Sequence, residues 1–279
     1  MLVAFYCLGL IQQQRSIGSG TGGTPASVSS LSGNVGRGGC GVVGTASYVD
    51  SRLEASLNDL LLGDSSQPFA HFFLNNDRKR LRQETDSGST RALTMHFAGS
   101  GSEVEKHRAA LSIADALFVG GAGNALLDVD CAAEAAKVQD GAAAEDVLDA
   151  LKARVLDVIR RCPKSVVVLQ RIEELPMLYG KLPGVVIFER LFEETSVDHH
   201  ASQVDLRMAT FILTSNVGGT ALRSREITSR SFYEPQSGGG ASQLTSEVTR
   251  IINEGVAQWL SRSRPALGGR LSNSAVPFV

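Results

Sequence analysis

The 279-residue chain is 43% hydrophobic and 20% charged, and its formal net charge is −2. This composition suits one globular α/β domain of about 200–240 residues, and it lacks the charge excess typical of nucleic-acid-binding or membrane-surface proteins. No apolar run reaches the ~18–20 residues that a membrane-spanning helix needs, so no transmembrane span is predicted.

The N-terminal part is expected to stay outside the folded domain. Residues 1–11 have the length of a signal-peptide core but lack a basic flank, and a truncated or misassigned N-terminus is the alternative. Residues 12–45 are rich in Gly, Ser and Thr, which predicts a flexible linker. We therefore expect a disordered segment over residues 1–45 and a folded domain over residues 50–279.

The four cysteines give no motif. They lie far apart in the sequence and show no CxxC spacing, so neither a metal knuckle nor a redox motif is visible. Buried free thiols are the expectation for all of them: Cys7, Cys40, Cys131 and Cys162.

Two helices are predicted before the first core strand. Residues 51–62 form an amphipathic pattern, with Ser51 as the expected N-cap and Gly63 just past the C-terminus. Residues 67–74 predict a second short helix, and the charged segment 75–90 predicts a loop.

The central stretch runs from Arg91 to Phe118. Residues 93–97 alternate in the manner of a strand, a Gly-Ser-Gly-Ser loop follows, and helical spacing begins near Glu105. A strand, a glycine loop and a helix with a lysine at its start form the layout of a phosphate-binding loop. The candidate anion-binding residues of this loop are Gly99, Ser100, Gly101 and Lys106.

The remaining chain alternates between strands and helices. Apolar runs predict strands at residues 125–129, 165–169 and 208–215, and a last strand within residues 270–279. Helical patterns cover residues 142–161, 184–194 and 243–261, while residues 197–205, with His199 and His200, and residues 234–242 are expected to be loops. This alternation predicts a parallel sheet with helices on both faces.

Ligands of such sheets bind beyond the carboxyl ends of the strands. Lys106 with its glycine loop, the pair Gln170 and Arg171, and Asn216 all follow predicted strands. We therefore expect these groups to converge on one cleft.

The order of these segments resembles an AAA+ ATPase of the Clp/torsin branch. The likeness rests on LEASLNDLLLG (53–63), HFAGSGSEVEKHRAALSIADALF (96–118), CPKSVVVLQRIEELP (162–176), ATFILTSNVGG (209–219) and LGGRLSNSAVPFV (267–279). It implies a three-layer αβα P-loop NTPase large domain, ATP as ligand, and protein partners or homologous AAA+ subunits. It also makes Asn216 the sensor asparagine, and Arg270 either a finger toward a neighbouring subunit or an ordinary solvated arginine.

The likeness departs from the family pattern in both nucleotide motifs. Glu105 stands where the Walker A loop has glycine, and His107 stands where it has the Mg²⁺-binding Ser or Thr. Imidazole is a poor ligand for a hard cation such as Mg²⁺. Gln170 and Arg171 replace the Walker B Asp and Glu, so the metal carboxylate and the general base are missing. Phosphoryl transfer depends on these groups, and no catalytic residue or metal ligand is predicted.

Two further features bear on whether the chain resembles Clp unfoldases or torsins. The chain stops after its last predicted strand, so the small helical lid of the family is expected to be absent. Residues 128–146, where Clp unfoldases carry an aromatic pore loop, contain no aromatic residue, which favours the torsin side.

Three functions are open. The first is an AAA+ protein with a degenerate nucleotide site that binds or remodels protein complexes. The second is an active torsin-like, ATP-hydrolysing chaperone, and the third is a structural α/β domain without nucleotide. The torsin likeness with an N-terminal signal implies the endoplasmic reticulum lumen; otherwise the cytoplasm is expected. In the degenerate site, Arg171, together with Lys106, is expected to hold Glu105 or Glu103 as an internal substitute for phosphate.

Overall fold

The computed structural model describes residues 40–57, 92–193, 196–199, 202–227, 240–260 and 264–279. These residues belong to one compact unit, Arg37–Val279. The helix expected at residues 67–74 and the loop at residues 75–90 lie outside the described residues.

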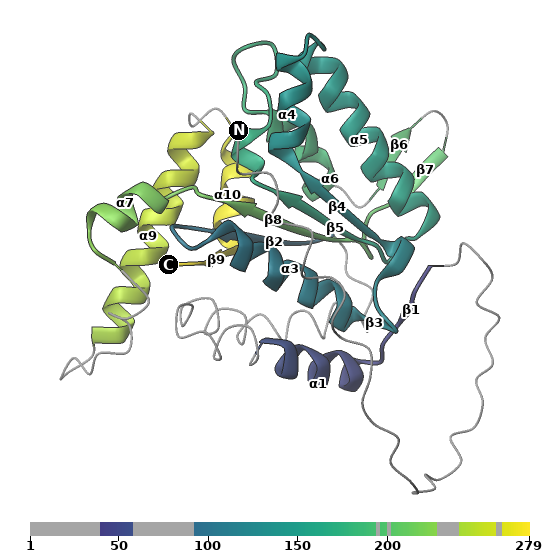
Figure 1. Cartoon of the computed structure of the whole chain (residues 1–279), viewed down its shortest axis with the longest axis horizontal. Coiled ribbons are helices and arrows are strands. Elements are labelled where there is room, and N and C mark those ends of the chain that lie inside the picture. Colours follow the sequence, from purple (N-terminus) through teal and green to yellow (C-terminus); the bar gives the residue numbers. More distant parts are fainter. Residues whose placement is uncertain (1–39, 58–91, 194–195, 200–201, 228–239, 261–263) are drawn as a thin grey trace, which may run out of the picture. The chain divides into compact units, whose positions relative to one another are not determined.

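A five-stranded parallel sheet forms the centre of this unit (Figure 1). In spatial order its strands are β4 (Leu126–Asp130), β5 (Val166–Gln170), β8 (Thr210–Ser215), β2 (Leu93–Ala98) and β9 (Ala275–Pro277). Leu93 and Val166 both align with Thr210, from opposite sides of β8. The expected parallel sheet is therefore confirmed, with the strand before the glycine loop beside the strand before Asn216.

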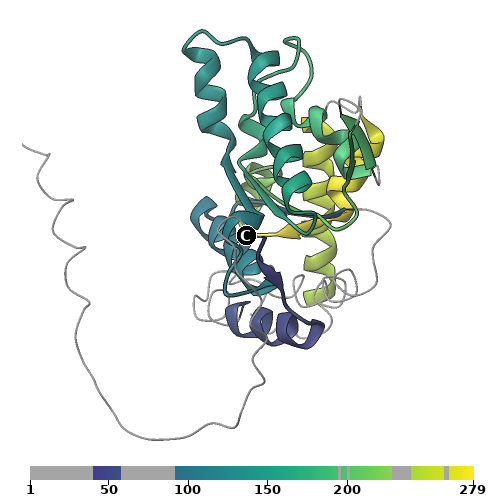
Figure 2. The same cartoon turned by 90° about the vertical axis from the view of Figure 1, so that its right-hand side faces the viewer.

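Helices cover both faces of the sheet, which makes three layers (Figures 1 and 2). On one face lie α1 (Ala46–Leu57) and α3 (Glu103–Leu117), and on the other α5 (Ala144–Arg161), α9 (Gly240–Trp259) and α10 (Pro265–Asn273). Val166 and Val168 of β5 join the core beneath α3, whereas Val167 and Leu169 join the core beneath α5. Both faces of β5 are buried, which explains why its sequence is apolar at successive positions.

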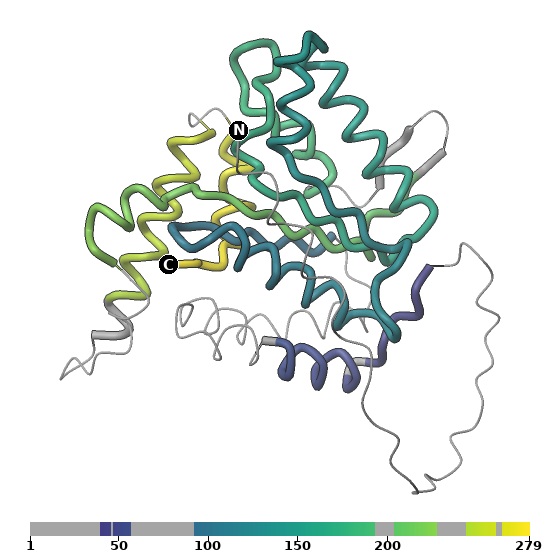
Figure 3. Tube along the Cα trace, in the orientation of Figure 1, coloured from purple at the N-terminus to yellow at the C-terminus, as the bar shows by residue number. Residues whose placement is uncertain are grey.

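Shorter elements connect the layers, and Figure 3 traces the chain through them. They are β1 (Val42–Val43), β3 (Phe118–Val119), η2 (Gly123–Ala125), α4 (Cys131–Gln139), η3 (Ile172–Glu174), η4 (Gly184–Phe188), α6 (Glu189–Glu193), β6 (Ser196–His199), β7 (Ser202–Asp205) and α7 (Gly219–Ser224).

Two local expectations are wrong. Helix α1 begins at Ala46, so Ser51 is not its N-cap; the Ser51 hydroxyl instead donates to the carbonyl of Tyr48, within the helix. Residues 196–205 contain the antiparallel pair β6–β7 rather than a loop, because backbone pairing stabilises polar strands that hydrophobic periodicity does not reveal. The last strand expected within residues 270–279 is confirmed as β9, which is three residues long and follows helix α10.

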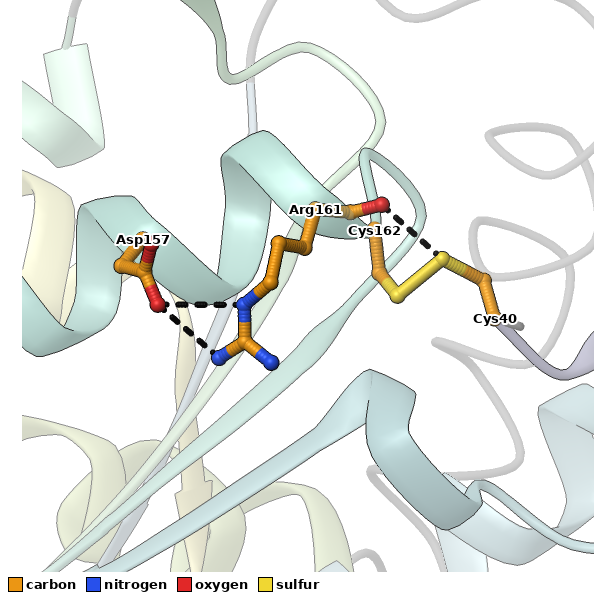
Figure 4. Close-up of a disulfide and its surroundings, with 4 residues drawn as sticks. All are labelled: Cys40, Asp157, Arg161 and Cys162. Atoms are coloured by element: carbon orange, nitrogen blue, oxygen red, sulfur yellow. Dashed lines mark hydrogen bonds and ion pairs between the residues drawn. A yellow bond between two sulfur atoms is a disulfide. The ribbon is translucent and has the colours of Figure 1, made fainter. Parts of the chain in front are cut away.

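The expectation of free thiols is wrong for one pair. Cys40 and Cys162 form a disulfide across 122 residues of sequence, with their Cα atoms 5.5 Å apart (Figure 4). The bond ties the segment before β1 to the end of α5, so residues 40–45 belong to the folded unit and not to a linker. Cys131 is a buried free thiol, and burial raises its pKa above the ordinary value.

No helix among the described residues combines the length and the apolar character that crossing a bilayer requires.

A buried histidine lies in the central strand β2. His96 is fully buried, with Nε2 2.7 Å from the Ser215 hydroxyl and Nδ1 3.4 Å from the Leu271 carbonyl. Burial is the main cause that lowers its pKa from 6.5 to about 4, and the charge of Lys106 acts in the same direction.

This histidine should make the stability depend on pH. Below pH 6.5 the unfolded chain binds a proton that the folded chain does not bind until about pH 4. Stability should therefore fall as the pH falls through this window, by about 3 kcal/mol. Urea unfolding of wild type and His96→Gln between pH 4.5 and 7.5 measures this loss. The variant should show a flatter pH dependence, and His199→Gln should keep the wild-type slope; equal slopes for wild type and His96→Gln would contradict the assignment.

Candidate functional site

The carboxyl ends of the strands bring the predicted site residues together. The glycine loop follows β2, Gln170 ends β5, and Asn216 follows β8, which lies between those two strands. The parallel registers place these ends at one edge of the sheet. The strand ends therefore lie together as expected, while a cleft shared by these residues and their binding role stay predictions.

The glycine loop is closed by the last strand. Gly99 has φ +123°, and a Cβ added there would lie 2.2 Å from the Phe278 carbonyl oxygen. That same carbonyl accepts a hydrogen bond from the Gly101 N–H at 3.0 Å. A backbone donor that a bound phosphate would need is thus already engaged within the chain.

The start of helix α3 carries its own cap and its own negative charges. The Ser102 hydroxyl accepts from the Val104 N–H at 3.2 Å and is the N-cap. Glu103 and Glu105 lie in the first turn, where carboxylates stabilise the helix dipole.

Lys106 is completely buried, and oxygen atoms surround its ammonium. Its Nζ lies 2.6 Å from Glu103 Oε1 and 2.6 Å from the Ser215 carbonyl. The Gly99 carbonyl and Asn216 Oδ1 each lie 3.1 Å away. An ammonium has three protons to donate, so these four acceptors use all of them. Desolvation lowers the pKa of Lys106, and the adjacent Glu103 opposes that shift.

The carboxylate of Glu103 is bound on both oxygens. While Oε1 pairs with Lys106, Oε2 accepts from the Thr214 hydroxyl at 2.9 Å. The hydroxyl oxygen of Thr214 accepts in turn from the Arg171 N–H at 3.0 Å. Glu103 therefore serves as the internal anion that the sequence predicts for this site.

The guanidinium of Arg171 does not bind that carboxylate. Its backbone is left-handed, with φ 55°, and its guanidinium forms a two-point pair with Asp130, in which Nε lies 3.1 Å from Oδ1. The expected pairing of Arg171 with Glu105 or Glu103 is therefore wrong. The Arg171 guanidinium pairs with Asp130 because Asp130 ends the adjacent strand β4, opposite Gln170 in the sheet register.

Glu173 is a site residue that the sequence analysis missed. It lies in η3, three residues beyond β5, and its Oε1 accepts from the Asn216 N–H at 2.7 Å. Desolvation raises its pKa, although that hydrogen bond opposes the shift. Glu173 and Asn216 line a pocket of about 670 Å³, together with residues of α9 that include Ile251, Gln258 and Trp259. The sequence signal that could have identified Glu173 is a glutamate only three residues after a buried strand, at the edge where ligands bind.

His107 and Gln170 meet a second missed residue, Asp128 of β4. His107 Nε2 lies 2.8 Å from Asp128 Oδ2, and Gln170 Nε2 lies 2.8 Å from Asp128 Oδ1. Asp128 alternates with apolar neighbours in an edge strand, and sequence alone did not pair that strand with β5.

Arg270 lies far from this edge. Its Nη2 donates to the Ala92 carbonyl at 2.7 Å, just before β2 begins, whereas Lys106 binds Gly99 just after β2 ends. The half-buried guanidinium is therefore held within the chain at the opposite end of the strand, and its role as a finger toward a neighbouring subunit stays a prediction.

Comparison with known proteins identifies the fold. No protein-family model and no curated protein matches the chain. Hsp104 in its closed state, with ATPγS and FITC-casein, superposes with a TM-score of 0.50 at 17% identity, over 82% of this chain and 36% of that one. The fold is that of an AAA+ P-loop domain. The ADP complex of S. cerevisiae Hsp104 matches with 14% identity and a TM-score of 0.49, again over 82% and 36% of the two chains. The chain spans about a third of the length of these Hsp104 chains.

The ion pair at Lys106 should be measurable as a coupling energy. Glu103→Gln should lower the free energy of unfolding by about 1–3 kcal/mol, because it leaves a buried ammonium with neutral acceptors only. Together with Lys106→Met and the double variant, urea unfolding gives a mutant cycle with an expected coupling above about 1 kcal/mol. The control is Glu174→Gln. Glu174 is the exposed last residue of η3, so this change should alter the free energy of unfolding little. A coupling near zero would contradict the pair.

Proposed function

We propose that the chain is a torsin-like AAA+ protein whose nucleotide site is closed from within, and that it acts by binding protein partners. The observation that carries the proposal is the saturation of Lys106 by Glu103 and three further oxygens. ATP would have to displace the Glu103 carboxylate from the ammonium and break its hydrogen bond from Thr214.

The backbone supports the same conclusion. The N–H of Gly101 donates to the Phe278 carbonyl, so the loop offers fewer free donors to a phosphate. Under the AAA+ likeness, His107, Gln170 and Arg171 occupy the positions of the Mg²⁺ ligands and the general base. In this chain these side chains pair with Asp128 and Asp130 instead.

Partner binding is the activity that an AAA+ domain retains without hydrolysis. We infer that the partners are proteins, either homologous AAA+ subunits or the complexes they remodel. The support is the AAA+ fold together with the closed site. The alternative, an active torsin-like ATPase, requires that Glu103 leave Lys106 when ATP arrives.

Nucleotide assays test the proposal. The purified chain should show no Mg²⁺-dependent ATP turnover above background, and calorimetric titration should detect no ATP binding that Mg²⁺ strengthens. Glu103→Gln should bind ATP more tightly than wild type, because it removes the competing anion. Turnover near ~1 s⁻¹ that is lost in Lys106→Ala would contradict the closed site and favour the active chaperone.

We further propose that the protein resides in an oxidising compartment, with the endoplasmic reticulum lumen as the compartment that the torsin likeness implies. The support is the disulfide between Cys40 and Cys162. Such bonds persist in oxidising compartments and are rare in the cytosol.

Trapping thiols at cell lysis tests the compartment. In cells that produce the protein, Cys40 and Cys162 should resist alkylation until a reductant is added. Cys40→Ser with Cys162→Ser should lower the free energy of unfolding by about 2–4 kcal/mol, whereas Cys131→Ser should leave the disulfide intact. Full alkylation of Cys40 in unreduced lysates would argue for a reducing compartment.

A further inference from the structure

Tyr179 is the most exposed large hydrophobic residue in the part of the chain that the structure describes, with 70% of its surface accessible. Its backbone is left-handed, with φ 51°, a conformation that is rare for bulky residues and that Asn and Gly adopt more readily. The chain therefore keeps an aromatic side chain in water on an unfavourable backbone. Residues held in such conformations are concentrated at functional positions.

A short hairpin holds this tyrosine in place. The Leu178 N–H donates to the Leu182 carbonyl at 2.7 Å, and the Leu182 N–H donates to the Leu178 carbonyl at 3.0 Å. Both leucines pack against the core beneath α5. The Tyr179 N–H donates to Glu145 Oε1, in the first turn of α5, at 3.1 Å. The tip of the hairpin, residues 179–181, is thus already ordered, so its side chains lose little freedom when they bind a partner.

The chemistry of the tip defines the surface that it fits. Tyr179 offers an apolar ring with a hydroxyl donor, and the exposed Lys181 adds a positive charge two residues later. A three-residue hairpin tip is too narrow to enclose a ligand, but it can enter a hollow on another protein. Tyrosines that enter such pockets often dominate the binding energy of protein interfaces. The matching hollow would have apolar and aromatic walls and a negative charge.

The pocket of about 670 Å³ between α7 and α9 has these properties. Its apolar lining residues are Val217, Ala221, Ile251 and Trp259. Of the described residues that line it, Glu173 and Glu254 are acidic and none is basic. Glu254 pairs with Arg250 at 2.6 Å, and its side chain is 62% exposed. Such surface pairs contribute little, so the Glu254 carboxylate can also attract a second cation.

We propose that the tip of one chain docks into this pocket of a second copy, with the Tyr179 ring against Trp259 and the Lys181 ammonium near Glu254. In its own chain the tip is tied to Glu145 of α5, and Tyr179 is not among the residues that line the pocket. The tip that fills the pocket must therefore come from another chain. Because tip and pocket are different surfaces, the contact is head-to-tail. The proposal takes from the proposed function only that the partner is a protein.

Sedimentation velocity of the purified full chain tests the proposal. The wild-type sedimentation coefficient should rise with concentration, with a dissociation constant of ~1–100 μM, as expected for a small contact. Tyr179→Asn should weaken association at least about tenfold, and the turn should be kept because Asn accepts a left-handed backbone. Glu254→Lys should weaken it by about tenfold, because it places a like charge against Lys181. The control is Val42→Thr, which changes a similarly exposed side chain elsewhere and should associate like wild type.

Mixing the two weakened variants separates a head-to-tail contact from a tip-to-tip contact. Tyr179→Asn keeps an intact pocket and Glu254→Lys keeps an intact tip, so an equimolar mixture should form a heterodimer and no larger species. Circular dichroism checks that each variant is folded. Three results would overturn the proposal: a wild type that stays monomeric up to ~100 μM, wild-type association of folded Tyr179→Asn, or a mixture that stays monomeric. None of them measures ATP binding, so this proposal and the closed nucleotide site fail separately.

Discussion

The buried ammonium of Lys106 is the interaction on which the carboxyl edge of the sheet depends. A lone charge inside a protein is costly, so the chain must surround it with oxygen. The acceptors come from the end of β2, the end of β8 and the first turn of α3, at Gly99, Ser215 and Glu103. Each of these segments is thereby held at a fixed distance from the others, and the loop between strand and helix has little freedom to open.

The Lys106 ammonium can therefore serve in one of two ways. A lysine at the start of a helix after a glycine loop can bind a phosphate, or it can bind the oxygens of its own chain, but it has only three protons to share. Here a carboxylate on the preceding turn stands in for the anion, and the neighbouring strands supply carbonyls. Desolvation lowers the pKa of Lys106 and raises that of Glu173, so the cluster holds its charges only through close contacts.

Much of this arrangement could be predicted from the sequence, because buried parallel strands read as apolar runs. Residues 93–97, 165–169 and 208–215 indicated the central strands. The need to balance charge indicated an internal carboxylate, but left Glu103 and Glu105 open and assigned it chiefly to Arg171, which pairs with Asp130 instead. The partners in space could not be predicted. Asp128 and Asp130 lie in an edge strand whose neighbour only the folded sheet reveals. The bond between Cys40 and Cys162 spans 122 residues and leaves no local spacing to recognise.

The residue after the last strand holds the glycine loop through its backbone. Phe278 is bonded on both sides, since its N–H donates to the Ala98 carbonyl and its own carbonyl accepts from Gly101. Strand β9 is three residues long and lies at the edge of the sheet, but Val276 in it and Phe278 just after it are fully buried. Opening the glycine loop would therefore have to break these backbone hydrogen bonds and expose buried apolar side chains together. The conformation of the glycine loop is thus coupled to the far end of the sequence, through the Phe278 backbone and the apolar core beneath it.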